Sequence, residues 1–372
     1  MPLTPVPPIH GNRLPERPLV VISILNWNGW RDTIACLESV YAQDYPNFLT
    51  VVVDNGSWNG SAERIRRWAI RRLGKEAAVV EYDRWTALAG GRSEDEARLD
   101  GSEPGSRLVL IRSRENLGWA GGNNMVRAYS LRRRSVRFVF FLNNDAVLGA
   151  GSLTKLVDVG ACLRKVVLAP VEQTPGADGA LDHLSLPRFL FAPLVSPGRP
   201  GRDTGPLRES EVVSGAAMLV SRAVLEDFLC SEGECFSSKI FLYWEDHLFC
   251  HLAGRRGSVV GYVRDAAVWH KGSASSGGAL SPLLFYYRER GKIFAANAAL
   301  PLGLRALFHV VNPWLCVARA AKYALASPDC AQAALCGFAD GLRGVGGKWR
   351  DHDRFAGLSF QSPPLLAEEN ER

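Results

Sequence analysis

Five acidic and histidine side chains stand where they could support catalysis or metal binding. Asp54 and Asp145 each follow a run of bulky apolar residues, Glu245 and Asp246 are adjacent, and His270 closes a short apolar stretch. Asp145 could hold a hard divalent cation on phosphate oxygens, because Mg²⁺ binds through one or two carboxylates plus substrate. His270 could be a second ligand. One carboxylate of the Glu245–Asp246 pair could act as a general base, which contributes about 10²- to 10⁴-fold to a rate.

Each of these residues also has a plainer explanation. Asp145 can cap a strand-to-helix turn, where Asn and Asp are favoured. Glu245 and Asp246 can be first-turn residues that the helix dipole stabilises. A single histidine such as His270 can simply satisfy a local hydrogen bond. The neighbouring residues bear on the choice between these explanations.

Polar residues follow three apolar, strand-like segments. Asn26 and Asn28 come after the first segment, Asp54 to Ser57 after the second, and Asn143 to Asp145 after the run at 138–142. If the strands are parallel, all three ends open on the same edge of the sheet, where ligands of open α/β sheets bind. One polar strand end is a turn, but three on one edge predict a pocket wall.

The segment "NLGWAGGNN" places Gly118, Gly121 and Gly122 between a strand and the start of a helix. Their backbone amides could receive a phosphate at the helix N-terminus, or the glycines could serve only tight packing. The pattern is neither Gly-x-Gly-x-x-Gly nor a P-loop, so it does not support a dinucleotide or P-loop ATP site.

Alternating strands and helices must position these residues. Apolar runs predict strands, and segments with helical character lie between them; the strands are expected at 19–25, 49–53, 108–112, 138–142 and 166–169, and the helices at 31–42, 62–73, 125–131 and 153–163. This alternation predicts right-handed crossovers, a mostly parallel twisted sheet and helices on both of its faces.

Other segments break the alternation. Residues 82–107 are acidic and without period, which suggests a surface insertion loop, and 172–210 suggests a long excursion or a hairpin. The strand-like stretch 211–222 has small residues at its centre, so something must approach its backbone closely. Strands are expected at 258–263 and 266–270, and the Ser/Gly-rich tract 271–281 is a candidate mobile lid.

Composition sets broad limits on the protein. The chain has 372 residues, a net charge of +6 and eight cysteines without zinc-type spacing, which favours a reduced, cytoplasmic globular protein. The basic residues are dispersed over helices and form no aromatic-and-basic stripe, so nucleic-acid binding ranks last. The apolar stretch 294–326 contains prolines and basic residues, which favours amphipathic helices that pack on the domain or lie on the inner face of the membrane.

Seven motifs in order resemble a known family. The chain resembles the inverting, nucleotide-sugar-dependent glycosyltransferases of family 2, which have the A-type fold. Within that family it resembles the rhamnosyltransferase-like members most closely. The motifs run from Val20 to His270 and are "VVISILNWNG", "VVVDNGSWNGS", "ENLGWAGGNN", "FLNNDAVL", "VVSGAAMLVSR", "FLYWEDHLFC" and "VWHKGSAS". The resemblance implies an A-type catalytic domain at 18–280 between a flexible leader (1–17) and a C-terminal helical extension (281–345), with a flexible tail at 346–372.

The resemblance also implies roles for individual residues. Asp145 matches the last acid of the family's metal motif and would hold Mg²⁺ or Mn²⁺ on the donor diphosphate, with His270 approaching from the far side. Asp246 matches the carboxylate that deprotonates the acceptor hydroxyl, and Glu245 its orienting neighbour. Asp54 would contact the donor's pyrimidine. The remaining residues implied in nucleotide-sugar binding are Asn26, Asn28, Ser57, Asn116, Gly118, Gly121, Gly122, Asn123 and Asn144.

The expected activity is the transfer of a hexose or deoxyhexose, rhamnose among the candidates, from a UDP, dTDP or GDP donor. The acceptor would be a glycan or a polyprenyl-linked molecule of cell-surface polysaccharide synthesis. Many relatives carry an acid and an arginine where this chain has Leu248 and Leu252, so its acceptor can differ from theirs. The alternatives are a sugar-nucleotide pyrophosphorylase-like nucleotidyltransferase, which would need a basic phosphate loop near the first strand, and a non-catalytic nucleotide-sugar binding module.

Overall fold

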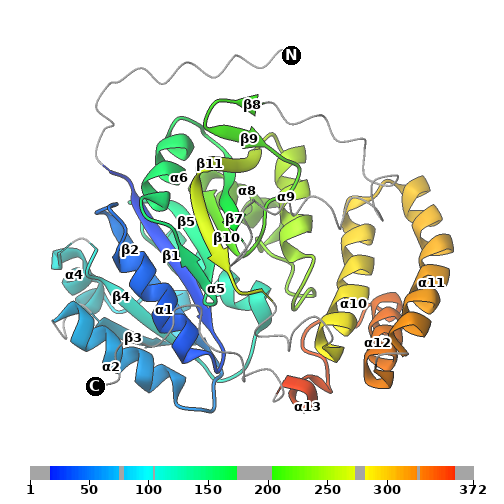
Figure 1. Ribbon diagram of the computed structural model, residues 1–372. Coiled ribbons are helices and arrows are strands. Elements are labelled where there is room, and N and C mark those ends of the chain that lie inside the picture. The colour runs from blue at the N-terminus through cyan, green and yellow to red at the C-terminus, as the bar shows by residue number, and fades with distance from the viewer. Residues whose placement is uncertain are drawn as a thin grey trace.

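The computed structural model describes residues 17–74, 79–103, 105–173, 203–272, 281–324 and 327–356. A central twisted sheet carries helices on both faces, and a group of helices from the C-terminal part of the chain stands beside it (Figure 1). This α/β architecture is the one that the sequence predicts.

The first half of the chain forms the parallel part of the sheet. Its strands lie in the order β3-β4-β2-β1-β5 and all run in the same direction. β1, β2, β4 and β5 each end within three residues of the expected boundary, because continuous apolar runs are required where both faces of a strand are buried. β3 was not expected from the sequence. The strands are β1 (Leu19–Asn26), β2 (Phe48–Asn55), β3 (Val79–Asp83), β4 (Leu108–Ser113) and β5 (Val136–Asn143).

The second half of the sheet contains one reversed strand. β10 (Ala217–Ser221) lies antiparallel between β5 and β7 (Val166–Gln173), and β7 pairs in parallel with β11 (Val259–His270). β11 is continuous, with an irregular register between Val263 and Ala267, where the sequence predicts two strands. The short β6 (Ala146–Leu148) pairs with the end of β11. The carboxyl ends of β1, β2, β5, β7 and β11 therefore share one edge with the start of β10.

Two hydrophobic cores lie on the two faces of the sheet. On one face, apolar residues such as Ile22 and Ile24 of β1 contact α1, α2 and α6; on the other, Val21 belongs to the core that α5, α8 and α9 cover. The helices are α1 (Trp30–Tyr41), α2 (Ser61–Leu73), α5 (Gly118–Arg132), α6 (Ser152–Ala161), α8 (Arg222–Glu232) and α9 (Glu245–Arg255).

The sequence suggests a surface loop at residues 82–107, but the structure shows regular secondary structure there. These residues complete β3 and continue into α3 (Arg84–Ala89) and α4 (Ser93–Gly101). Asp83 caps α3 by accepting hydrogen bonds from the amides of Trp85 and Thr86, and Leu99 of α4 is buried in the core. These helices are too short to show a clear period in the sequence, which explains the incorrect prediction.

Part of the predicted excursion at 172–210 is a hairpin. β8 (Asp203–Thr204) and β9 (Leu207–Glu209) are antiparallel, and β9 pairs with β11. Residues 174–202, and residues 273–280 of the candidate lid, lie outside the described residues.

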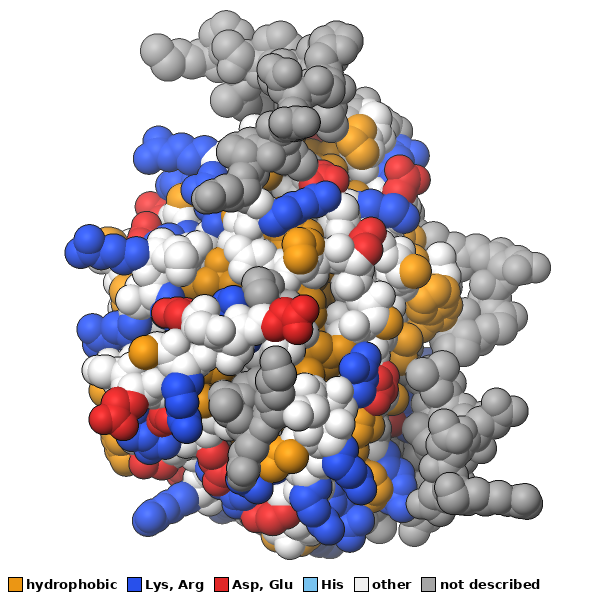
Figure 2. Space-filling view, turned by 90° about the vertical axis from the view of Figure 1, so that its left-hand side faces the viewer, with side chains coloured by type: hydrophobic (Ala, Val, Ile, Leu, Met, Phe, Trp, Pro, Cys, Tyr) orange, Lys and Arg blue, Asp and Glu red, His pale blue; other side chains and the backbone are white. Residues whose placement is uncertain are grey.

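Charged side chains on the side of the molecule turned away from α11 are mixed in sign (Figure 2). Two arginines of α2 illustrate this: Arg72 lies 3.1 Å from Glu38, and Arg66 lies 3.8 Å from Glu81. The arginine-rich segment is thus a solvated helix face with acidic neighbours.

The C-terminal helices form an extension beside the sheet. They are α10 (Pro282–Ala299), α11 (Leu302–Ala324), α12 (Pro328–Arg343) and α13 (His352–Ala356). A buried carboxylate, Glu289 of α10, joins two of them through 2.8 Å contacts to Lys292 and to Arg319 of α11. Among the described residues, no helix combines the length and apolarity that a membrane crossing requires.

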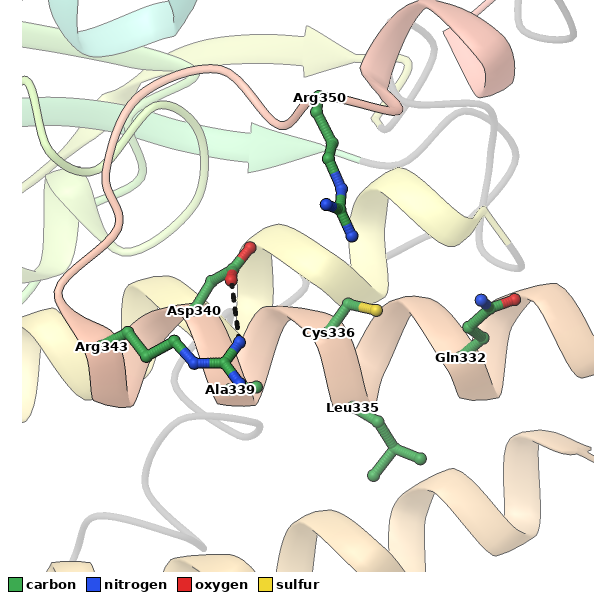
Figure 3. Close-up of a pocket in the computed structure, with 7 residues that line it drawn as sticks. All are labelled: Gln332, Leu335, Cys336, Ala339, Asp340, Arg343 and Arg350. Carbon is green, nitrogen blue, oxygen red and sulfur yellow. Dashed lines mark ion pairs between the residues drawn. The ribbon is translucent and has the colours of Figure 1, made fainter.

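A shallow pocket of about 450 Å³ lies on this extension (Figure 3). Cys336, Asp340 and Arg343 of α12 line it together with Arg350, and Asp340 also accepts a hydrogen bond of 2.6 Å from the Tyr286 hydroxyl. The pocket therefore belongs to the helical extension and contains none of the polar residues at the strand ends.

Residues 346–356, which the sequence assigns to a flexible tail, are packed against α10. Trp349 stacks on Tyr286, and its amide donates to the Tyr287 hydroxyl, which lies 3.0 Å from Nδ1 of His352. His352 is 2% exposed. The ordered extension thus runs at least to Ala356; residues 357–372 lie outside the described residues.

Acidification is expected to destabilise the protein in part through His352. Burial, assisted by the charge of Lys348, lowers the pKa of His352 to about 4. The unfolded chain, with a histidine pKa of about 6.5, therefore takes up a proton that the folded chain does not. The neutral His352 therefore costs no stability above about pH 6.5, and the loss of stability grows as the pH falls to about 4, where it reaches about 3 kcal/mol. Urea unfolding at several pH values should show a shallower decline for His352→Gln than for the wild type; equal slopes would contradict this assignment.

Candidate functional site

Polar side chains from the ends of β1 and β2 form a hydrogen-bonded cluster. The Asn26 amide donates to Asp54 Oδ1 at 2.7 Å and to Ser57 Oγ at 3.1 Å, and its oxygen accepts from the Thr33 hydroxyl of α1 at 2.9 Å. Asn26 is fully buried and Asp54 is 5% exposed. We call Asn26, Thr33, Asp54 and Ser57 the β1–β2 polar cluster.

The loop after β1 is fastened to the loop after β2. Asn28 adopts a positive φ of 57°, a conformation that Asn tolerates better than most residues. Its amide donates to Ser57 Oγ at 2.8 Å, and its side-chain oxygen accepts from the Trp58 amide at 3.0 Å. The polar ends of the two strands therefore form one rigid surface.

Asn144, which follows β5, joins this cluster from the other side of β1. Its amide donates to Thr33 Oγ1 at 3.1 Å. Asn116 lies farther along the edge, where Asn55 of β2 donates to its side chain at 3.1 Å and accepts from the Leu117 amide at 3.0 Å. Asn26, Asn28, Asp54, Ser57 and Asn144 thus lie along one edge, as the sequence predicts, and Asn116 lies farther along it.

The glycines of α5 are used for close packing. Gly118 has a φ of 70°, and a Cβ there would collide with the Phe241 carbonyl. A Cβ on Gly121 would lie 2.9 Å from Leu117, and one on Gly122 would lie 2.9 Å from Leu25 of β1.

The first amides of α5 are engaged inside the protein. Leu117, Gly118 and Trp119 donate to Asn55, Asn116 and the Phe241 carbonyl. Asn123 is 2% exposed and accepts from Ser23 Oγ at 2.8 Å beneath β1. These contacts favour the packing explanation for Gly118, Gly121, Gly122 and Asn123; a role in nucleotide binding stays a prediction.

His270 at the end of β11 lies between two carboxylates. Its Nε2 is 3.2 Å from Asp145 Oδ1, and its Nδ1 is 2.9 Å from Oε1 of Glu172 near the end of β7. Burial alone would lower the pKa of His270, but the hydrogen bonds and charges of Asp145 and Glu172 raise it to about 10. The structure therefore brings the two predicted metal-binding residues together and adds Glu172.

Asp145 and His270 could hold a divalent cation that a substrate completes, provided that the cation displaces the proton between them. A metal-binding histidine commonly donates its other ring nitrogen to a carboxylate, which is the position of Glu172. In the described part of the chain, no three His, Cys, Asp or Glu residues are grouped for one metal ion. Asp145 and His270 alone would supply two ligands, which suits Mg²⁺ or Mn²⁺ when phosphate oxygens and water supply the rest.

Asp246, at the start of α9, is held as an ionised carboxylate. Its Oδ2 accepts from the Gly215 amide at 3.0 Å, and its Oδ1 accepts from the His247 amide at 2.8 Å and lies 2.8 Å from His247 Nδ1. Burial works to raise the pKa of Asp246, but the charge and hydrogen bonds of His247 and the Gly215 amide lower it below its ordinary value. The same contact with Asp246 outweighs burial and raises the pKa of His247.

Glu245 has the opposite character. Its side chain is buried, and among the described residues Oε2 has no hydrogen-bond partner. Burial, together with the neighbouring charge of Asp246, raises the pKa of Glu245 well above its ordinary value. The pKa values of the two adjacent carboxyl groups are therefore shifted in opposite directions, downward for Asp246 and upward for Glu245. Environments that push the pKa values of a pair apart are typical of acid–base sites.

Asp246 reaches the same sheet edge as Asp145. Asn143, two residues before Asp145, donates its amide to the Ala216 carbonyl at 2.8 Å, and the amide of the preceding Gly215 binds Asp246. The Asn143 side chain lies 3.4 Å from His270 Nε2. One continuous set of contacts thus connects the carboxylate–imidazole pair to the candidate base.

The helical extension packs against both sides of this edge. Trp27, next to Asn26, lies 5.1 Å from the ring of His352, and Phe241, four residues before Glu245, stacks on Tyr287 at 5.1 Å. Leu248 of α9 is buried with Ala295 of α10, so an apolar contact occupies the position where many members of the resembled family carry an acid. The extension therefore supports the loops that carry the site.

Replacing Gly215 with Ala is expected to lower turnover by about tenfold without unfolding the protein. The added Cβ would lie 3.0 Å from Asp246 Cβ and 3.1 Å from its Oδ2, so the carboxylate must shift by a few tenths of an ångström. A misplacement of about 1 Å can cost 10²-fold in rate. Steady-state kinetics and thermal unfolding measure the two effects.

Gly254→Ala in α9 is the matched control, because nothing lies within 4 Å of its added Cβ. Equal turnover of the two variants would contradict a positioning role for Gly215. The contact itself confirms the sequence prediction that something approaches the backbone at the centre of 211–222 closely.

Several residues of the site were missed in the sequence. His247 directly follows the Glu245–Asp246 pair, and Lys271 directly follows His270. Their positions next to predicted site residues could have identified both. In the structure, Lys271 lies 3.4 Å from Asp32. Thr33 and Glu172 lie within a helix and a strand whose patterns are ordinary. Only the three-dimensional structure shows that Thr33 contacts Asn26 and that Glu172 contacts His270.

Comparisons with known proteins support the fold. No protein-family model matches the chain. The low-salt glycan biosynthesis hexosyltransferase Agl10 of Haloferax volcanii is 24% identical over 200 residues, which are 51% of this chain and 61% of the relative. The match thus covers less than two thirds of that relative's length.

Solved structures of other proteins resemble this chain, among them the following two. The mannosyltransferase PcManGT from Pyrobaculum calidifontis, in complex with GDP-Man and Mn²⁺, superposes with a TM-score of 0.51 at 17% identity, over 88% of this chain and 87% of that one. S. aureus TarS 1-349 with UDP-GlcNAc has a TM-score of 0.48 at 16% identity, over 91% and 83%. The likeness to the mannosyltransferase confirms the expected fold, a mixed α/β sheet of the glycosyltransferase A type.

Proposed function

We propose that this protein is an inverting, metal-dependent glycosyltransferase of family 2 and is rhamnosyltransferase-like. It would move a hexose or deoxyhexose from a nucleoside-diphosphate sugar to a glycan or polyprenyl-linked acceptor in cell-surface polysaccharide synthesis, at the inner face of the membrane. The observation that carries the proposal is the meeting of the Asp145–His270 pair and the ionised Asp246 at one sheet edge. The fold, and a partial match to a protein named as a hexosyltransferase, support it.

The β1–β2 polar cluster would receive the nucleoside of the donor. The Asn26 amide donates to Asp54 and to Ser57, so both of these side chains are fixed in place before a base arrives. Asn144 and Ser57 border the same surface. The diphosphate would then extend from this cluster toward Asp145, which lies one residue beyond Asn144.

Asp145 and His270 would hold Mg²⁺ or Mn²⁺ against the donor diphosphate. As the bond between the anomeric carbon and the diphosphate breaks, negative charge develops on the leaving group, and a bound cation stabilises that charge as a Lewis acid. A single unit charge at 4 Å is worth about 4 kcal/mol at an effective dielectric constant of about 20. Glu172 would orient His270 through its Nδ1 hydrogen bond.

Asp246 would be the base. Its ionised carboxylate would take the proton of the acceptor hydroxyl while the acceptor oxygen bonds to the anomeric carbon and the leaving diphosphate takes the bond's electrons. One base on the side opposite the leaving group gives in-line attack and inversion, with no covalent enzyme intermediate. Burial and the charge of Asp246 raise the pKa of Glu245 and favour its neutral form, which would keep a second negative charge away from the acceptor.

Thermal-shift measurements with candidate ligands test the donor assignment. UDP, dTDP and GDP, each with Mn²⁺, Mg²⁺ or EDTA, would be compared with inorganic pyrophosphate. A ligand at about 100 times its Kd stabilises a protein by about 2.7 kcal/mol, so the matching nucleotide with a metal should raise the Tm by a few degrees. Stabilisation by pyrophosphate alone would count against nucleoside recognition. No stabilisation by any of the nucleotides would refute the donor assignment.

A further inference from the structure

The outward side of α11 is apolar and exposed. Leu307, Val310, Trp314 and Val317 recur at helical spacing and are 50%, 66%, 77% and 58% exposed. We call these four residues the outer face of α11. The opposite side of the same helix is buried through Phe308, Asn312, Cys316 and Ala320. A helix that is apolar on nearly all sides requires a second apolar environment besides its own domain.

The charges around this face suit an anionic surface. α11 has no Asp or Glu along its 23 residues, and its basic residues stand near its ends: Arg305, and the pair Arg319 and Lys322. Arg319 is used internally with Glu289, but Lys322 is exposed. Residues 281–356 contain ten Lys and Arg and five Asp and Glu. A second copy of this face, which has basic but no acidic residues, would be repelled by the first copy. Anionic lipid headgroups would instead attract the face.

The position of α11 leaves this face free to meet a flat surface. α11 is the outermost helix of the extension, on the side away from the sheet (Figure 1). No described helix can span a bilayer, so α11 would lie in the interface and not cross it. Trp314, the most exposed large apolar residue in the protein's described part, is of the residue type enriched at membrane–water interfaces.

We propose that the outer face of α11 docks the protein on an anionic lipid bilayer. The four apolar side chains enter the headgroup region, and the exposed Lys322 contacts the lipid phosphates near the C-terminal end of the helix. This surface does not depend on the proposed reaction, since none of its residues contacts the Asp145–His270 pair or Asp246.

Vesicle co-sedimentation of the full chain tests the proposal. Vesicles of phosphatidylcholine with about one third phosphatidylglycerol should bind the wild type, and the double variant Val310→Glu/Trp314→Glu should partition at least about tenfold more weakly. Trp85→Glu is the matched control, because Trp85 is 71% exposed on α3 and should bind like the wild type. Lys322→Gln should weaken binding several-fold, and only to vesicles that contain the anionic lipid.

Three outcomes would overturn the proposal. The first is that the wild type fails to bind the anionic vesicles. The second is that the double variant, with an unchanged Tm, binds as well as the wild type. The third is that light scattering shows a wild-type dimer that the double variant converts to monomers without any change in vesicle binding. None of these readouts measures catalysis, so a failed donor assignment and a failed membrane surface are told apart.

Discussion

Asp246→Asn is expected to reduce turnover by about 10²- to 10⁴-fold while donor affinity changes little. The amide has the shape of the carboxylate and can still accept a hydrogen bond from the Gly215 amide, so the local structure should persist. It cannot take a proton from an acceptor hydroxyl. The release of nucleoside diphosphate under saturating donor and acceptor measures turnover, and calorimetric titration of the donor measures affinity.

Glu245→Gln is the matched control for this prediction. Because burial and the Asp246 charge raise the pKa of Glu245 and favour its neutral form, an uncharged amide of the same size is a mild replacement. We expect less than a tenfold change in turnover. If Glu245→Gln lost activity to the extent predicted for Asp246→Asn, while Asp246→Asn stayed near the wild type, the base would have to be reassigned to Glu245.

The pH dependence of turnover follows from the same contacts. The pKa of Asp246 is lowered, so the base stays ionised well below neutral pH, and acidic loss of activity should begin only near or below the ordinary carboxyl range. The interaction with protonated His247 contributes to that low value. A base held at low pKa is weak, which fits a reaction in which departure of the diphosphate, rather than proton removal, dominates the barrier.

The strands that carry the site could be predicted because burial on both faces leaves a strong signal. β1, β2 and β5 are continuous apolar runs, and in each the first polar residues mark the carboxyl end. If the strands pair in parallel, their carboxyl ends must lie at the same edge of the sheet, and no further information is needed to predict this. The convergence of Asn26, Asp54 and Asn144 therefore followed from local patterns and a general rule of sheet topology.

Contacts that depend on the antiparallel strand β10, or on residues far apart in the chain, leave no such signal in the sequence. The antiparallel β10 places Gly215 against Asp246, which is 31 residues away in the chain, and only the small side chains of 211–222 hinted at a close approach. The pairing of His270 with Glu172 spans 98 residues, and Glu172 stands in an ordinary strand. Likewise α3 and α4 are too short for periodicity to separate them from a loop.

Asp145→Asn is expected to weaken metal binding by about 100-fold or more and to abolish most turnover at physiological metal concentrations. The substitution keeps the size of the side chain but removes the negative charge that Mg²⁺ or Mn²⁺ would contact, and a hard cation binds a neutral amide far less well than a carboxylate. Titrating Mn²⁺ in the presence of the donor nucleotide, with Tm and turnover as readouts, measures both effects.

Glu172→Gln should have a smaller effect of the same kind, about 10- to 100-fold in metal affinity, because Glu172 contacts His270 and not the cation. Asp158→Asn, at an exposed ion pair with Arg17, controls for the loss of one charge from the surface. The order Asp145→Asn, Glu172→Gln, Asp158→Asn in decreasing effect supports a cation held by Asp145 and His270. If all three variants showed the same Mn²⁺ dependence as the wild type, the Asp145–His270 pair would be a structural ion pair alone. Other residues would then have to stabilise the charge of the leaving group.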